Sequence, residues 1–203
     1  MKISSIDIRL CRHDQPLMKD AEMRDGKKSD LEFIVITFET DEGLSSSTFG
    51  FAGRGALMAG EIANSIFKPF FLGRDPLYRE KHWHEYRMAD RWWNHAPIYS
   101  YGPFDINCWL LSAIKADQPL YKYLGAYRDS VPIYASSLVL STPEDYAKEA
   151  LEYKKKGFNA YKLHPPGNYD FDLEAHIAAR KAVGDKFKLM SDPVAPYTFE
   201  QAL

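Results

Sequence analysis

The 203-residue sequence predicts two fold classes in succession, an α+β arrangement over residues 1–125 and a parallel β/α arrangement over residues 126–203. In the first part, strand-like stretches come first and helical stretches follow, which is typical of an α+β layout. In the second part, short apolar strands alternate with amphipathic helices. That alternation favours a parallel sheet or a β/α barrel.

The first part begins with three strands. The stretch KISSIDIRL alternates apolar and polar residues, which predicts a half-buried strand with Ile3, Ile6, Ile8 and Leu10 facing inward. LEFIVITFETDEGL is rich in β-branched and aromatic residues, and SSSTFGF can return beside it as a hairpin. The polar segment from 14 to 30 has no periodicity and is long for a connection, so it is expected to be either mobile or functional.

Three helical stretches follow the strands. Residues 55–73 place apolar side chains near helical spacing, which predicts the first helix. Asp75 is the expected N-cap of the second helix, with Pro76 at its first position. The third helical pattern runs from Gly102 to Gly125.

The second part alternates between the two kinds of element. VPIYASS, FNAYKLH and KFKLMSD read as strands. The helix between the first two strands has Thr142 as its N-cap and Gly157 as its stop, and FDLEAHIAARKAVG forms the next helix. Three strands do not close a barrel of eight. The pattern therefore predicts an incomplete barrel with an open edge. Either partner chains cover that edge or the chain is part of a longer protein, and we favour the second explanation.

Composition and charge narrow the function classes. The net charge is −2, with 26 basic and 28 acidic residues, which argues against a general nucleic-acid binder. Signal-peptide and membrane-spanning patterns are not found, so a cytoplasmic protein without a membrane partner is expected. Cys11 and Cys108 are predicted to be buried free thiols. A homo-oligomer is also expected, because partner chains could cover the open edge of the last strand.

Three polar residues stand where strands end. Lys162 and His164 are two apart, so they share one face at the end of their strand, and Asp192 ends the next strand. The carboxyl ends of barrel strands line active sites. A lysine or histidine can take a proton from carbon, and an aspartate is a ligand suited to Mg²⁺.

Each of these residues also has a plain structural interpretation. A lysine at a strand end is commonly solvated, a histidine before Pro-Pro is commonly a loop residue, and Asp-Pro commonly starts a turn. Spacing alone leaves both interpretations open.

The whole chain resembles the enolase superfamily, in its mandelate racemase/muconate lactonizing enzyme branch. The resemblance is carried by six stretches in the family's order: KISSIDIRL, FLGRDPLYRE, DINCWLL with QPLYKYLG, VPIYASS, GFNAYKLH and AVGDKFKLMSD. It implies an α+β capping domain, residues 1–125, followed by the first part of a TIM-type barrel, residues 126–203. A full relative is roughly twice as long as this chain.

The resemblance also implies roles for residues. Lys162 matches the first lysine of the family's Lys-x-Lys motif, which helps to bind the substrate carboxylate. His164 occupies the position of the second lysine, which is often the base, so this chain departs from the family there. Asp192 matches the first magnesium ligand, while Val194 stands where the family often has asparagine. The remaining Mg²⁺ ligands are expected outside this chain.

The activity implied is that of a Mg²⁺-dependent dehydratase that removes the α-proton of an acid sugar and eliminates water. A racemase, epimerase or cycloisomerase with the same first step is the alternative, and so is a truncated, non-catalytic structural or binding fragment. The expected partner is a small-molecule carboxylate. Two capping-domain loops set specificity in the family, and here Arg24, Lys27 and Arg54 are the candidate substrate-binding residues.

Overall fold

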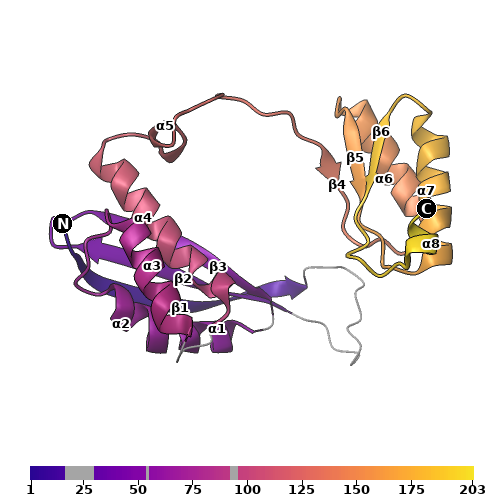
Figure 1. Ribbon diagram of the computed structural model, residues 1–203. Coiled ribbons are helices and arrows are strands. Elements are labelled where there is room, and N and C mark those ends of the chain that lie inside the picture. Colours follow the sequence, from indigo (N-terminus) through magenta and orange to yellow (C-terminus); the bar gives the residue numbers. More distant parts are fainter. Residues whose placement is uncertain (17–29, 54, 92–95) are drawn as a thin grey trace. The chain divides into compact units, whose positions relative to one another are not determined.

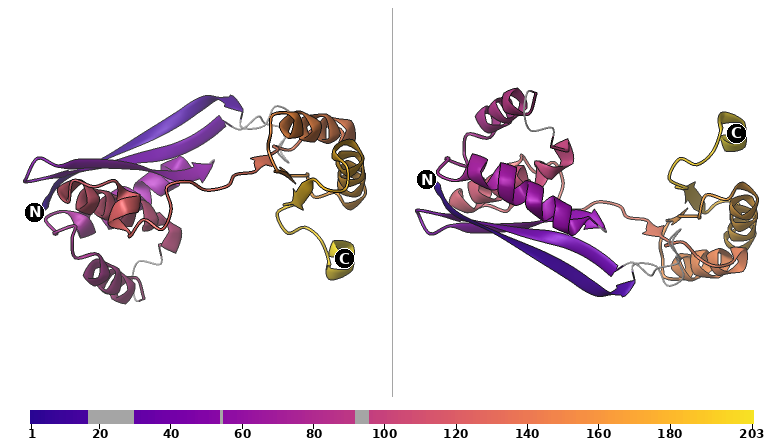
Figure 2. Two further views of the ribbon diagram at one scale, coloured as in Figure 1. Left: turned by 90° about the horizontal axis from the view of Figure 1, so that it is seen from above. Right: turned by 90° about the horizontal axis from the view of Figure 1, so that it is seen from below.

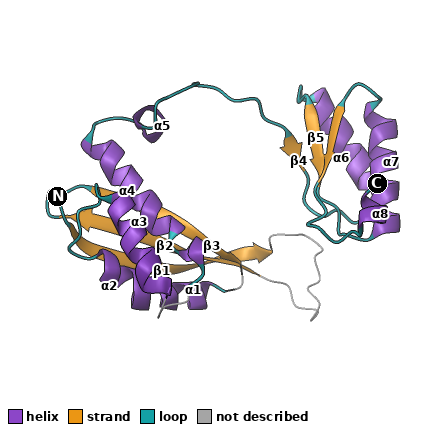
Figure 3. Cartoon of the chain, in the orientation of Figure 1, coloured by secondary structure: helices purple, strands orange, loops and turns teal. Residues whose placement is uncertain are grey.

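A computed structural model describes residues 1–16, 30–53, 55–91 and 96–203. The chain divides into two compact units, and the boundary between them lies after Tyr127. Below, "unit 1" means the described residues up to Tyr127 and "unit 2" means Arg128–Leu203. Figure 3 shows that unit 1 combines long strands with helices, whereas unit 2 alternates short strands with helices.

Unit 1 is built on a three-stranded antiparallel sheet in the order β1-β2-β3. Helices lie on one side of this sheet (Figures 1 and 2). Its elements are β1 (Ile3–Pro16), β2 (Asp30–Thr40), β3 (Ser45–Gly53), α1 (Ala56–Ile62), the π-helix Ala63–Phe67, α2 (Lys68–Phe71), α3 (Arg79–Ala89), the 3₁₀ turn Ile98–Ser100, α4 (Gly102–Lys115) and α5 (Leu120–Tyr123).

The core of unit 1 is aromatic. Phe71 is fully buried, and its ring lies 5.8 Å from that of Phe38 on the sheet and 5.4 Å from that of Phe104 on α4. Tyr86 stacks on Tyr101 with ring centroids 4.8 Å apart. Rings of this size bury large apolar areas and dominate the stability of a core. The helices are therefore held against the sheet chiefly by aromatic packing.

Several details of unit 1 differ from the sequence prediction. Ile3 and Ile6 both face the core because a register shift between Ile3 and Ser5 replaces strict alternation, whereas Leu10 is 55% exposed, so its predicted burial is wrong. Helix α3 begins at Arg79 because the Asp75 carboxylate accepts the backbone N–H of Leu77 and caps a turn before the helix. The predicted 102–125 helix divides into α4 and α5.

The two cysteines are free thiols, as predicted, but only Cys108 is buried. Burial raises the pKa of the Cys108 thiol far above its usual range. Cys11 is partly exposed, so the prediction of burial is wrong for that residue. None of the helices in the described ranges is long and apolar enough to cross a bilayer.

Unit 2 is built on a parallel sheet in the order β4-β5-β6. Helices α6 and α7 lie on the same side of this sheet (Figures 1 and 2). Its elements are β4 (Ala135–Ser136), α6 (Pro143–Lys155), β5 (Ala160–Leu163), α7 (Tyr169–Val183), β6 (Lys188–Ser191) and α8 (Phe199–Ala202).

Helix α6 begins as the sequence predicts, because the Thr142 hydroxyl accepts the backbone N–H of Asp145 and caps it. Helix α7 begins at Tyr169, before the predicted Phe171, because the Asn168 side chain caps it by accepting the backbone N–H of Phe171. The alanines that face the sheet from these helices are fully buried with Tyr161 and Leu163 of β5. Small residues at these positions let the helices approach the sheet closely. Because the helices cover only this face of β5, the polar side chains of the strand can lie on its other face.

Candidate functional site

The candidate site lies at the carboxyl end of β5, the central strand of the parallel sheet. Tyr161 and Leu163 are buried on the side of the helices, so Lys162 and His164 face the other side. The neighbouring chain segments are fixed to this strand end. The backbone N–H of Ser137 donates to the carbonyl of Lys162 at 3.0 Å, and that of Asp192 donates to the carbonyl of Leu163 at 2.9 Å.

Lys162 and Asp192 are in direct contact. The lysine Nζ lies 2.9 Å from the aspartate Oδ2, and both side chains are partly exposed. The hydrogen bond from Lys162 holds the pKa of the Asp192 carboxyl below its usual range, and burial opposes this. The same bond raises the pKa of Lys162. At neutral pH, Lys162 is therefore a cation, suited to attract an anionic group and not to take a proton.

The backbone of His164 is fixed from both sides. Its N–H donates to the Ser137 hydroxyl at 2.8 Å, and its carbonyl accepts from the Tyr146 hydroxyl at 3.1 Å. Tyr146 is fully buried on α6, and its hydroxyl also accepts the backbone N–H of Leu140 at 2.9 Å. The imidazole itself is partly exposed. His164 therefore has a rigid backbone and an accessible ring, which suits a group that must meet a substrate.

Ser137 and Tyr146 are residues that sequence reasoning missed. Ser137 looks like an ordinary polar residue after a strand, and Tyr146 looks like part of the apolar stripe of a helix. The one available signal was the hydroxyl of a buried tyrosine, because such a hydroxyl needs a hydrogen-bond partner.

The chain after β6 has an unusual backbone. Val194 has a φ of 60° and Ala195 has a φ of 57°, both in the left-handed region. Non-glycine residues there cost on the order of 1–3 kcal/mol each, and a β-branched residue is a marked outlier. The backbone N–H of Val194 lies near the Asp192 carboxylate and helps to lower the pKa of that carboxyl. The strained loop thus brings a backbone donor close to the aspartate.

The structure brings together the three residues that the strand ends single out. Lys162 contacts Asp192, and His164 is close enough to lower the pKa of the Asp192 carboxyl. Their catalytic and metal-binding roles stay predictions. The other three candidates, Arg24, Lys27 and Arg54, lie outside the described residues.

The described residues do not by themselves form a magnesium site. Mg²⁺ prefers octahedral oxygen coordination, usually through one or two carboxylates together with water or substrate oxygens. No group of three or more His, Cys, Asp or Glu side chains in the described ranges is placed to hold a metal ion. Asp192 is a suitable hard ligand, but its Oδ2 is engaged by Lys162. A single carboxylate in this state does not fit tight Mg²⁺ binding.

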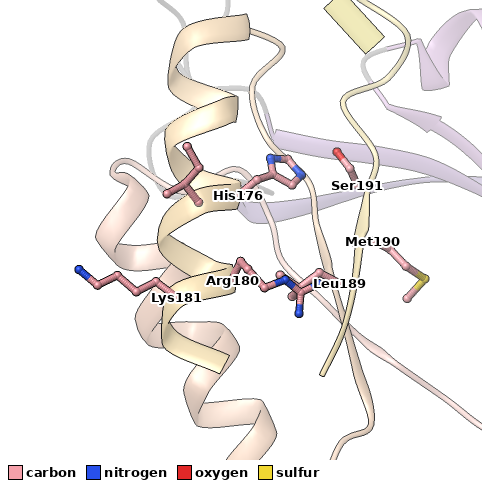
Figure 4. Close-up of a pocket in the computed structure, with 7 residues that line it drawn as sticks. His176, Arg180, Lys181, Leu189, Met190 and Ser191 are labelled. Carbon is pink, nitrogen blue, oxygen red and sulfur yellow. The ribbon is translucent and has the colours of Figure 1, made fainter. Parts of the chain in front are cut away.

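A hollow of about 580 Å³ lies between α7 and β6, and none of these three residues lines it (Figure 4). The Arg180 guanidinium in its wall donates to the carbonyls of Gly184 at 2.8 Å and Phe187 at 2.7 Å. Arg180 is therefore already engaged by the backbone that follows α7. The side chains labelled in its wall are His176, Arg180, Lys181, Leu189, Met190 and Ser191.

The relatives and solved structures that resemble this chain all belong to one enzyme family. No family model matches the chain. An N-succinyl-L-Arg/Lys racemase from Bacillus cereus is 28% identical over 200 residues, covering 95% of this chain and 52% of the racemase. An L-talarate/galactarate dehydratase from Salmonella typhimurium is 28% identical over 202 residues, covering 92% of this chain and 49% of the dehydratase.

A solved structure agrees with these relatives. The dipeptide epimerase from Enterococcus faecalis, in complex with Mg and the dipeptide L-Leu-L-Tyr, superimposes with a TM-score of 0.83 at 26% identity. The match covers 100% of this chain and 56% of the epimerase.

The match fixes the family and the fold class but not the reaction. The antiparallel unit followed by a parallel β/α unit corresponds to a capping domain with the first part of a barrel. The curated relatives include racemases, epimerases, dehydratases and cycloisomerases, and the chain spans about half of their length. The chain belongs to the enolase superfamily, in its mandelate racemase/muconate lactonizing enzyme branch.

Proposed function

We propose that this chain is part of an acid-sugar dehydratase that removes the proton α to a carboxylate and then eliminates water. Residues 1–125 would act as the capping domain and residues 126–203 would supply the first strands of the barrel. The observation that carries the proposal is the meeting of Lys162, His164 and Asp192 at the carboxyl ends of β5 and β6, where parallel β/α folds bind ligands.

Lys162 and His164 would have different roles in the reaction. Lys162 is a cation and would attract the carboxylate of the substrate, which places the α-carbon near the next residue on the same face, His164. The imidazole of His164 would take the α-proton, and the electrons of the broken C–H bond would pass into an enediolate. The β-hydroxyl would then leave with a proton as water, and the enol product would become a 2-keto-3-deoxy acid.

Magnesium is part of the proposal for the whole protein. When bound, Mg²⁺ would neutralise the negative charge that builds up on the substrate carboxylate. Asp192 is the candidate ligand in this chain, and we propose that the remaining ligands come from residues outside it. The structures of the dipeptide epimerase and of a D-glucarate dehydratase from Agrobacterium tumefaciens are both magnesium complexes, which supports this cofactor.

A racemase, epimerase or cycloisomerase is the second candidate, since relatives of similar identity include such enzymes. These reactions share the first proton transfer, so His164 would be the base in them as well. The substrate separates the two candidates. A dehydratase must release water from a β-hydroxy acid, whereas a racemase returns the proton and leaves the composition of the substrate unchanged.

The test begins with the intact mass of the natural gene product. A mass of 23.3 kDa with a single folded species would favour a non-catalytic module, whereas a longer product would be carried into the assay. That product is then incubated in D₂O with galactarate, talarate and arabinonate, and loss of the α-proton is followed by NMR.

His164→Asn is expected to reduce α-proton exchange by 10²-fold or more, about the value of a general base. His84→Asn is the matched control, because His84 is exposed on α3 and outside the site. Equal exchange in the wild type and His164→Asn would remove His164 from the role of base. Exchange on N-succinyl amino acids or dipeptides alone would replace the dehydratase with the racemase or epimerase.

A further inference from the structure

The loops that follow β5 and β6 meet at one buried side chain of α7. Asp172 is 1% exposed. Its Oδ2 accepts the backbone N–H of Gly167 at 3.0 Å and also accepts the hydroxyl of Tyr197. Gly167 lies in the loop after β5 and Tyr197 lies in the loop after β6. One carboxylate oxygen thus holds both loops at the end of the sheet where the candidate site lies.

The two loops also pack directly on each other. Gly167 has a φ of 89°, and a Cβ atom at that position would lie 3.0 Å from the Pro196 Cγ and 3.3 Å from its Cβ. Only glycine suits both this backbone conformation and this close approach. The Tyr197 ring lies edge-on to that of Tyr169, with centroids 6.2 Å apart. The contact is therefore built from both loops and from the first turn of α7.

The loop held by Tyr197 is the strained one. Val194 and Ala195, both left-handed, lie between Asp192 and the anchored Tyr197. Residues in such conformations persist only where the surrounding structure fixes them. Asp192 stands at the start of this loop, and its backbone N–H donates to the Leu163 carbonyl of β5 at 2.9 Å. The loop that Asp172 anchors through Tyr197 is therefore the segment that carries the aspartate that meets Lys162.

A purely local role for Asp172 explains only part of these contacts. An acidic side chain in the first turn of a helix can accept a backbone N–H ahead of the helix, as Asp172 does with Gly167. That role does not require a second donor from another loop. Nor does it explain why the carboxylate is buried, since burying a charged group is costly. Its Oδ1 has no hydrogen-bond partner among the described residues.

We propose that Asp172 is a positioning residue that ties the loops after β5 and β6 together and so holds Asp192 beside Lys162 and His164. The effect of Asp172 on catalysis rests on the proposed function. The link that Asp172 makes between the two loops does not, because it is a property of the folded chain. The experiment therefore measures the link between the loops first and activity second.

The link between the loops is tested by the hydrogen-exchange rates of single backbone amides, followed by NMR on the full 203-residue chain. Tyr197→Phe removes one hydroxyl and keeps the ring. The Asp192 amide, which donates to the Leu163 carbonyl, is expected to exchange about tenfold faster in this variant, while the Gly167 amide keeps its rate, because its own bond to Asp172 survives. Amides in the middle of α7, such as that of Ala179, report whether the fold is intact.

Asp172 itself is changed in two ways. Asp172→Ala is expected to speed exchange of the Gly167 and Asp192 amides about tenfold. Asp172→Asn is expected to restore most of the protection, because one amide oxygen can accept both donors. Asp170→Ala is the matched control, since Asp170 is exposed in the same helical turn and its removal tests the effect of charge alone.

The outcomes separate the interpretations. Unchanged exchange of the Asp192 amide in Tyr197→Phe would overturn the proposal, even if Asp172→Ala fails to fold. Equal effects of Asp170→Ala and Asp172→Ala would also overturn it. In the longer gene product, Tyr197→Phe is expected to lower kcat for α-proton exchange about tenfold with little change in KM. Lack of exchange on every acid sugar tested would count against the proposed function alone, since the amide rates need no substrate.

Discussion

The two units bury their aromatic residues in different ways. In unit 1, rings pack on rings, as Phe71 does against Phe38 and Phe104. In unit 2, the fully buried tyrosines, Tyr146 and Tyr161, each meet one further ring, but buried alanines pack beside them and their hydroxyls have polar partners. The packing in unit 1 is stabilised mainly by the apolar surface that it buries. The packing in unit 2 buries less apolar surface but places hydroxyl groups where they can form hydrogen bonds with neighbouring groups.

Buried polar groups show the same contrast. In unit 1, the Asn107 side chain donates to the Ile36 carbonyl and the Thr48 hydroxyl and accepts from Ser46, so it joins α4 to β2 and β3. In unit 2, Ser137 and Tyr146 bond to the backbone of His164. The polar network of unit 1 therefore fixes the fold, whereas that of unit 2 fixes the candidate site. Mutations should separate stability from function accordingly.

The largest effect is expected from Phe71→Ala. The change leaves a cavity among the rings that now surround Phe71, so the free energy of unfolding of unit 1 should fall by about 3–5 kcal/mol. Urea unfolding followed by tryptophan fluorescence measures it, because all four tryptophans of the sequence lie within residues 83–109. Leu57→Ala is the control, since Leu57 is 76% exposed and should cost less than about 0.5 kcal/mol. A loss below about 1 kcal/mol for Phe71→Ala would contradict the aromatic-core interpretation.

A smaller loss of stability is expected from Tyr146→Phe. The change removes the hydroxyl that bonds to Leu140 and His164, and leaves buried backbone groups without a partner, at a cost of about 1–2 kcal/mol. Thermal unfolding followed by circular dichroism measures the loss. Tyr153→Phe serves as the control, because the Tyr153 ring stacks on that of Tyr161 and is kept by the change. If both variants lose the same stability, the hydroxyl of Tyr146 has no special role.

The smallest effect is expected from pH. His82 is buried against Phe70 and Phe71, and burial lowers the pKa of its imidazole below the ordinary value of 6.5, with Arg74 adding to the effect. The unfolded chain therefore binds the proton more readily than the folded chain. The stability of unit 1 should be complete above about pH 6.5 and should fall as the pH drops below that value.

Urea unfolding at pH values between 7 and 5 tests this dependence. His82→Leu should lose the slope over that range, whatever its stability at pH 7. His84→Gln should keep the slope, because His84 is exposed. A slope that persists in His82→Leu would assign the pH dependence to other groups.

Much of the fold could be predicted from local sequence patterns, because neighbouring residues decide where a helix begins and which side chains of a strand share a face. The cap at Thr142 and the alternation of strands and helices in unit 2 are determined by neighbouring residues. The meeting of Lys162 with Asp192 could also be predicted, because parallel strands bring their carboxyl ends to one edge. The exposure of Leu10 could not be predicted, because alternation shows which residues share a face but not how fully a helix covers that face.

The support around the candidate site could not be predicted. The left-handed backbone of Val194 is unfavourable for that residue and exists only because distant contacts stabilise it. Asp172 looks like an ordinary acid in the first turn of a helix, and its bond to Tyr197 spans 25 residues. Such contacts depend on tertiary packing, which propensity does not encode.

The placement of the two cysteines makes chemical trapping a selective measure of one unit. Both thiols belong to unit 1, and Cys108 is sealed in its core. An alkylating reagent should therefore modify Cys11 first and reach Cys108 only when the aromatic core opens. The rate of the second modification, read by mass spectrometry, would give the opening frequency of that core, while unit 2, which has no cysteine, contributes no signal.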